Sequence, residues 1–112
     1  MKTKLSVFLF LSLLFTQSAL AWDGNVTGKI YEIDVTAAES YGFRVYLEGL
    51  PALCGNTNNW AYLNKSSSNY QTFVSVLLAA NMAGRSVTLY TTKETLSGND
   101  FCTIGYVTLR SN

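Results

Sequence analysis

Histidine is absent from all 112 residues, which removes the side chain that most often serves as a general base near neutral pH. The chain also contains no Gly-x-Ser-x-Gly and no Ser-x-x-Lys arrangement, the local patterns of two classes of serine enzyme. Without histidine, its two cysteines lack the usual second ligand of a zinc site and the base that activates a catalytic thiol. We therefore expect no catalytic residue, no metal and no cofactor, and we interpret the protein as a non-enzyme.

Two carboxylates, Glu32 and Asp34, alternate along the sequence and would share one face of a strand. Such a pair can catalyse glycoside hydrolysis. Lys29 and Arg44 lie beside them in the predicted sheet, so an exposed, charged sheet face is the simpler interpretation.

The amino terminus has the three parts of a secretory signal peptide, in order. These parts are the cations Lys2 and Lys4, an apolar run over residues 5–15, and the small-x-small site Ala19-Leu20-Ala21. The apolar run is too short to span a bilayer comfortably, and no later segment is apolar enough to do so. We therefore predict a cleaved signal over residues 1–21, in preference to a membrane anchor or a buried helix. Residues 22–112 then form one small domain that is secreted or periplasmic, and the lysine-containing start is typical of bacteria.

The sequence also lacks a strong excess of either positive or negative charge. Without Lys2 and Lys4, the predicted mature chain keeps six basic residues against seven acidic ones, a net charge of −1. Its basic residues are scattered along the sequence, which is the pattern of an ordinary solvated surface. Nucleic acid and anionic lipid are therefore not expected partners.

Both cysteines, Cys54 and Cys102, lie in the predicted mature part. In a short exported chain, two cysteines most simply form one disulfide bond. A domain of this size has a marginal core, so a covalent link across a long loop would stabilise it substantially.

Hydrophobic periodicity predicts five strands and one helix. Period-two alternation marks the strands and period-three-to-four spacing marks the helix. The predicted order is strands at 28–35, 43–48 and 60–63, a helix at about 69–83, and strands at 86–91 and 102–109. Polar residues at 92–100 predict a loop, and Gly105 inside the last strand predicts a bulge or a close backbone approach.

The predicted helix has a marked start and end. Ser68 and Gln71 fit a capping box at its start, and Gly84 fits a left-handed residue beyond its end. Its apolar face, with Tyr70, Phe73 and Leu77, would pack on the sheet. Strand-strand-strand-helix-strand-strand is the chain order of an OB-fold, a five-stranded barrel, and an α+β sandwich is the alternative.

Aromatic side chains give the best indication of a binding site. Asn58, Asn59, Trp60 and Tyr62 bring amides and rings together on one loop–strand junction. Rings stack on the C–H faces of sugars while amides hydrogen-bond sugar hydroxyls, so these residues are the predicted ligand-binding set. In the alternative interpretation, Trp60 anchors the core and the asparagines only form turns.

Three stretches carry a resemblance to a known family. They are the Phe43 strand that leads to Leu53-Cys54, Trp60 just before the helix, and residues 76–87, where the helix runs into Gly84-Arg85-Ser86-Val87. Together they resemble the OB-fold receptor-binding (B) subunits of bacterial five-subunit toxins, most closely the subtilase cytotoxin B subunit-like family. The resemblance implies an OB-fold, sugar binding, pentamers and an enzymatic toxin subunit as partner. It carries over no ligand contact residue by residue.

These observations predict an exported, non-enzymatic binding protein with a glycan ligand, similar to a toxin B subunit. The alternative is a periplasmic or secreted module that binds or inhibits another protein. A concave cluster of exposed aromatic residues would favour a glycan, and a flat apolar patch would favour a protein.

Overall fold

A computed structural model describes residues 21–37 and 41–111 of the chain. The predicted signal peptide at residues 1–21 therefore lies outside the described residues, apart from Ala21. The described part contains five strands and one helix, in the predicted order. Their bounds are β1 Gly24–Val35, β2 Phe43–Leu47, β3 Ala61–Tyr62, α2 Tyr70–Ala83, β4 Ser86–Leu96 and β5 Asn99–Leu109.

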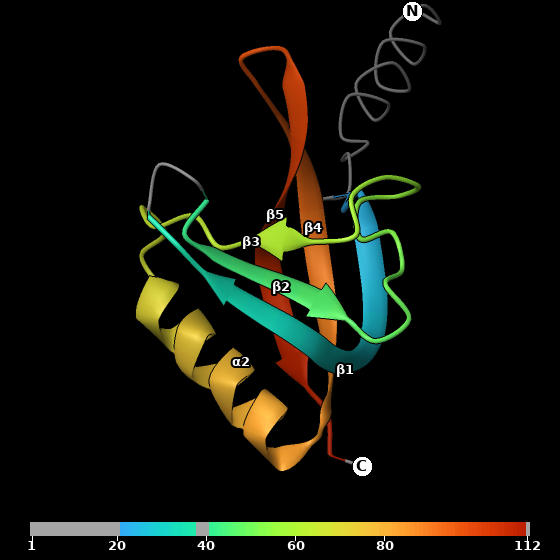
Figure 1. Cartoon of the computed structure of the whole chain (residues 1–112), viewed down its shortest axis with the longest axis vertical. Coiled ribbons are helices and arrows are strands. Elements are labelled where there is room, and N and C mark those ends of the chain that lie inside the picture. Colours follow the sequence, from blue (N-terminus) through green and yellow to red (C-terminus); the bar gives the residue numbers. More distant parts are fainter. Residues whose placement is uncertain (1–20, 38–40, 112) are drawn as a thin grey trace, which may run out of the picture.

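The five strands form one mixed sheet that closes on itself in the order β1-β2-β3-β5-β4. All neighbours are antiparallel except β3 and β5, which pair in parallel through Tyr62 and Thr103. Helix α2 packs against one end of this ring, as Figure 1 shows. The mainly β fold with one helix is confirmed, and ring closure distinguishes the sheet from the open sheet of an α+β sandwich.

Strand β1 pairs with two neighbouring strands because it bends. Its first half pairs with β4 from Gly24 onward, and its second half pairs with β2 up to Val35. A register shift between Ile30 and Glu32 inserts Tyr31 as an extra residue, which leaves the Tyr31 ring 60% exposed. Simple alternation, which would place Tyr31 on the same face as Ile33, is wrong at this bulge.

The predicted loop at 92–100 is wrong. Strands β4 and β5 continue through it as a long hairpin that projects beyond the ring (Figure 1). The chain reverses at Ser97 and Gly98, whose φ values of 53° and 80° fit a tight two-residue hairpin turn. Apart from Leu96, the residues of this projecting part are polar or glycine, so no hydrophobic alternation marks it as strand. The predicted irregularity at Gly105 is confirmed, because the register passes from Tyr106 to Ile104 and omits it.

The helix ends as predicted but begins differently. Gly84 has a φ of 65°, and Arg85 N–H donates to the Ala80 carbonyl, which closes the last turn. At the other end the cap residue is Asn69, and no side chain caps it. The predicted capping box of Ser68 and Gln71 is therefore wrong, because the helix begins one residue after the position that this box requires.

One side of α2 packs on the sheet. Leu77 and Ala80 are fully buried, and a second group packs against the core while partly exposed: Tyr70, Phe73 and Val74. Met82, which fits the same periodicity, is 88% exposed and does not belong to this face. Ala80, two residues before Met82, is still fully buried in the core, so the last turn of α2 contacts the sheet and Met82 lies on its solvent side.

The predicted disulfide between Cys54 and Cys102 is confirmed, with Cα atoms 5.8 Å apart. It joins the loop before β3 to strand β5, and both cysteines are fully buried. Around it lies a single core cluster to which every strand and α2 contribute. The disulfide thus fixes the loop that leads to Trp60 against β5.

Candidate binding site

Four aromatic side chains from three segments meet on the outer side of β3 and β5. We call Tyr41, Trp60, Tyr62 and Phe101 the β3 aromatic cluster. Tyr41 lies at its centre: its ring is stacked on Phe101 at 4.2 Å between centroids and meets Tyr62 edge-on at 4.9 Å. Trp60 lies further out, 6.2 Å from Tyr41 and 6.3 Å from Phe101. The structure therefore brings the predicted residues Trp60 and Tyr62 into one cluster through a residue that neither neighbours in sequence.

Alternation along β3 explains which rings face outward. Ala61 points into the core, so Tyr62 points out of the ring, where its cluster neighbours leave it only 6% exposed. Arg44 is the cross-strand partner of Tyr62 on β2, and its guanidinium lies 5.0 Å from the Trp60 ring centre. This cation–π contact orients Trp60 on the same outer surface.

Tyr62 connects the ring to the projecting hairpin. Its hydroxyl donates a hydrogen bond of 2.8 Å to Oε1 of Glu94 on β4. Burial first, and then the hydrogen bond and negative charge of Glu94, raise the pKa of Tyr62 to about 12. All of these effects favour the neutral phenol. Tyr62 is therefore a fixed hydrogen-bonding residue, not an acid–base group, at neutral pH.

Tyr41 has an unusual backbone. Its φ of 61° lies in the left-handed region, which is costly for a bulky residue that is not glycine. The surrounding rings hold it there, because the Tyr41 side chain contacts three members of the cluster. A strained residue that is held in place by packing is common at binding sites.

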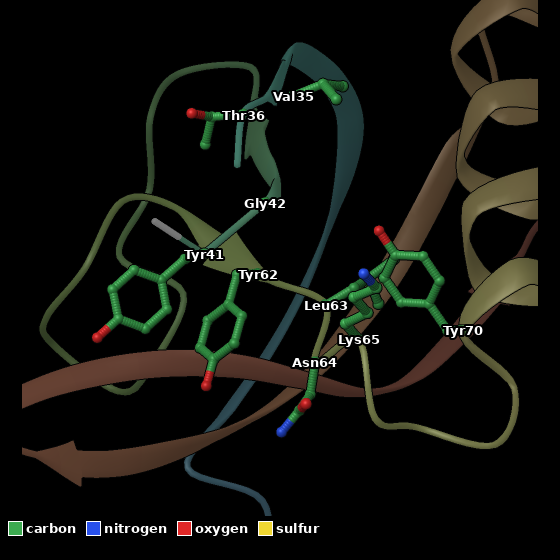
Figure 2. A pocket seen from close by; sticks show the side chains of 9 residues that line it. All are labelled: Val35, Thr36, Tyr41, Gly42, Tyr62, Leu63, Asn64, Lys65 and Tyr70. Atoms are coloured by element: carbon green, nitrogen blue, oxygen red, sulfur yellow. The ribbon is translucent and has the colours of Figure 1, made fainter. Parts of the chain in front are cut away.

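A pocket of about 310 Å³ opens beside Tyr41 and Tyr62. Figure 2 shows the two rings side by side with their hydroxyls on the same side, and Tyr70 of α2 across from them. The remaining lining residues are Val35, Thr36, Gly42, Leu63, Asn64 and Lys65. Rings, hydroxyls, an amide and an ammonium group thus surround one concavity.

The two asparagines of the predicted ligand-binding set, Asn58 and Asn59, do not line this pocket. Asn58 is half-buried with a φ of 60°, and its carbonyl accepts a hydrogen bond of 2.7 Å from Leu53 N–H. Asn59 is exposed. Of the predicted ligand-binding residues, the pocket lining includes Tyr62 but not Asn58, Asn59 or Trp60. Asn59 is followed in sequence by Trp60, whose ring lies 6.2 Å from that of the pocket residue Tyr41.

Sequence reasoning missed Tyr41, Phe101, Asn64 and Lys65. One signal could have placed Phe101: the disulfide fixes Cys102 beside Cys54, and Trp60 follows Cys54 by only six residues. Nothing in the local pattern of Tyr41, Asn64 or Lys65 sets them apart from loop residues.

The carboxylates Glu32 and Asp34 lie on the outer face of β1, opposite Tyr46 and Arg44 of β2. The hydrogen bond with Asp34 is the largest cause that raises the pKa of Glu32. Burial and the negative charge of Asp34 raise it further. Neither of the two carboxylates lines the pocket beside Tyr62. This arrangement fits the exposed sheet face that the sequence favours.

A second aromatic group, Trp22 with Tyr90 and Tyr106, lies on the outer side of β4 and β5. Its ring centroids are 4.8–6.4 Å apart. Gly105 makes room for Trp22, because a Cβ on Gly105 would lie 2.5 Å from Cζ3 of the indole. Trp22, the residue directly after the predicted cleavage site, thus packs closely on strand β5.

Within residues 21–37 and 41–111, no helix combines the length and the apolar character that crossing a membrane requires. The same residues contain no group of three potential metal ligands. No family model, curated protein or solved structure matches the chain.

Proposed function

We propose that the protein is an exported, non-enzymatic binding protein whose ligand is a glycan, held in the pocket beside Tyr41 and Tyr62. The observation that carries this proposal is the composition of the pocket wall. Two tyrosine rings lie side by side at its edge, with Asn64, Lys65 and Thr36 around them. Aromatic rings offer surfaces for sugar C–H groups, and the polar side chains offer partners for sugar hydroxyls.

The preorganisation of the two rings supports this proposal. Tyr62 is fixed by Glu94, and Tyr41 is fixed by its contacts with Phe101 and Tyr62. Rings that are already ordered lose little conformational entropy when a ligand binds. The pocket is nevertheless small and open at the surface, so we expect weak binding at a single site.

The closed five-stranded sheet with its helix between β3 and β4 supports an OB-fold for this chain. In this proposal the protein works in the periplasm or outside the cell, as a toxin B subunit-like molecule. Several copies, as in a pentamer, would convert weak single sites into useful avidity. An enzymatic toxin subunit would then be a further partner.

A glycan array probed with the exported, purified protein tests this function. We expect binding to a limited set of glycans, and Lys65→Ala should weaken it at least fivefold because the Lys65 side chain lines the pocket. Lys93→Ala is the matched control, since Lys93 is an exposed lysine on the projecting hairpin. Binding of no glycan at millimolar concentration would overturn the proposal.

A second function, protein binding, is favoured by one observation. Helix α2 carries no charged side chain, and it exposes Leu78 and Met82 to solvent. Exposed apolar residues on an uncharged helix are typical of a contact surface for another protein. This protein-binding or inhibitory module replaces the glycan proposal if the array finds no ligand.

A further inference from the structure

A second pocket, of about 390 Å³, lies next to the first, and its chemistry is different. Residues from α2 and from the ends of β1 and β2 form its wall: Val35, Phe43, Tyr70, Gln71, Val74, Ser75 and Leu78. None of them is charged. Val35 and Leu78 are 76% and 42% exposed, so apolar side chains line a hollow that is open to solvent.

Val35 and Tyr70 line both pockets. The two hollows are therefore adjacent, with these two side chains between them. One half presents the Tyr41 and Tyr62 rings with Asn64 and Lys65, and the other presents aliphatic surface from α2. We call the two adjacent hollows a two-part groove, with a polar aromatic half and an apolar half.

A simple sugar would use only the first half of this groove. A protein surface would have to insert both a polar and an apolar projection at once. The occupant that matches both halves in one small molecule is a glycoside whose anomeric oxygen carries an aliphatic chain. The sugar ring would lie against Tyr41, beside the edge of Tyr62, and the chain would pass Tyr70 and cover Val74 and Leu78.

We propose that the ligand of this protein is an amphiphilic glycoside, and that the α2 half of the groove binds its apolar aglycone. This inference rests on the glycan-binding function proposed above. It adds that the affinity for the aglycone comes from removing aliphatic surface from water. Each buried methylene contributes about 0.8 kcal/mol, or roughly fourfold in affinity. A chain that buries two or more methylenes should therefore gain about tenfold or more.

Calorimetric titration of the exported protein with matched probes tests the inference. The probes are n-octyl β-D-glucopyranoside and n-octyl β-D-galactopyranoside below their micelle concentrations, the two methyl glycosides, and n-octanol. We expect at least one octyl glycoside to bind about tenfold or more tightly than its methyl counterpart, and more tightly than n-octanol.

A pair of variants on one helix locates the effect. Leu78→Asn should remove most of the gain from the octyl chain and leave the methyl glycoside affinity unchanged, because Leu78 lines only the apolar half. Met82→Asn is the matched control: it lies one turn further along α2, is 88% exposed, and lines neither half. Circular dichroism confirms that both variants are folded.

The outcomes separate the two proposals. Equal affinity for octyl and methyl glycosides would overturn the aglycone inference and leave glycan binding intact. An octyl gain that Leu78→Asn preserves would also overturn it, because the chain would then bind elsewhere. If n-octanol binds as tightly as both octyl glycosides and no array glycan binds, the sugar half is unused, and the glycan function fails together with the inference.

Discussion

The Tyr62 hydroxyl donates a 2.8 Å hydrogen bond to Glu94, and this bond joins the shortest strand of the ring to the projecting hairpin. The two residues are 32 positions apart in sequence. Beside them, the Tyr41 ring stacks on Phe101 of the same hairpin. The position of the hairpin relative to the pocket therefore depends on contacts that the pocket residues themselves make.

Ultraviolet titration should identify Tyr62 among the seven tyrosines. Its pKa of about 12 lies above the ordinary value near 10, so its tyrosinate signal should appear last. Because the folded-state pKa is raised, its contribution to stability is complete below pH 10 and is lost as the pH rises through about 12. Tyr62→Phe should remove this late phase.

Glu94→Gln probes the cause of that shift. The substituted amide would keep an acceptor for the phenol but remove the charge, so the pKa of Tyr62 should fall but stay above its ordinary value, because burial is the largest cause of the rise. Glu48→Gln is the control, since it removes an exposed carboxylate from the end of β2. An unchanged pKa in Glu94→Gln would show that the carboxylate does not act on Tyr62.

Reduction of the Cys54–Cys102 bond should destabilise the protein without changing its fold class. The bond closes a loop of 48 residues, for which chain entropy gives about 4 kcal/mol. Urea unfolding of the Cys54→Ala/Cys102→Ala double variant should show a loss of roughly 2–4 kcal/mol. Titration of free thiols in the unfolded, unreduced wild type should find close to none, and two thiols per chain would contradict the bond.

Three substitutions on α2 should differ in cost according to burial. Leu77→Ala removes a fully buried side chain and should cost about 2–5 kcal/mol. Phe73 is half-buried, so Phe73→Ala should cost less than the roughly 3–5 kcal/mol typical of a buried phenylalanine. Met82→Ala should change the stability by no more than about 0.5 kcal/mol. Urea titrations compare the three, and a costly Met82→Ala would show that the end of the helix is covered.

The sequence indicated the order of the elements because most of them have a clear period. The alternation of Phe43, Val45 and Leu47 predicted β2, and all three residues are buried. The projecting hairpin could not be predicted in this way, because its strands pair only with each other and most of their residues are polar. Propensity and turn geometry at Ser97 and Gly98 determine it, and hydrophobic alternation does not.

The candidate site was only partly predictable for a related reason. Trp60 and Tyr62 were identified because rings and amides adjoin in sequence. Tyr41 and Lys65 reach the pocket through tertiary structure: Tyr41 by its left-handed backbone, and Lys65 by its position between β3 and α2. Neither property leaves a periodic signal in the sequence.

The extent of the binding surface is tested by comparing Asn59→Ala with Lys65→Ala. The sequence predicts a ligand over Asn59 and Trp60, whereas the pocket is lined by Tyr41 and Lys65 and by neither Asn59 nor Trp60. Both residues are exposed, so either substitution should leave the stability within about 0.5 kcal/mol of wild type. We expect Lys65→Ala to weaken binding of an array-selected glycan at least fivefold, measured by calorimetry.

For a glycan of one or two rings, which the pocket alone can hold, Asn59→Ala should have no effect. For longer glycans, Asn59→Ala should weaken binding as well if further sugar rings extend to Trp60 and its sequence neighbour Asn59. Loss of binding in Asn59→Ala together with full binding in Lys65→Ala, both folded by circular dichroism, would move the site away from the pocket and onto the loop before β3.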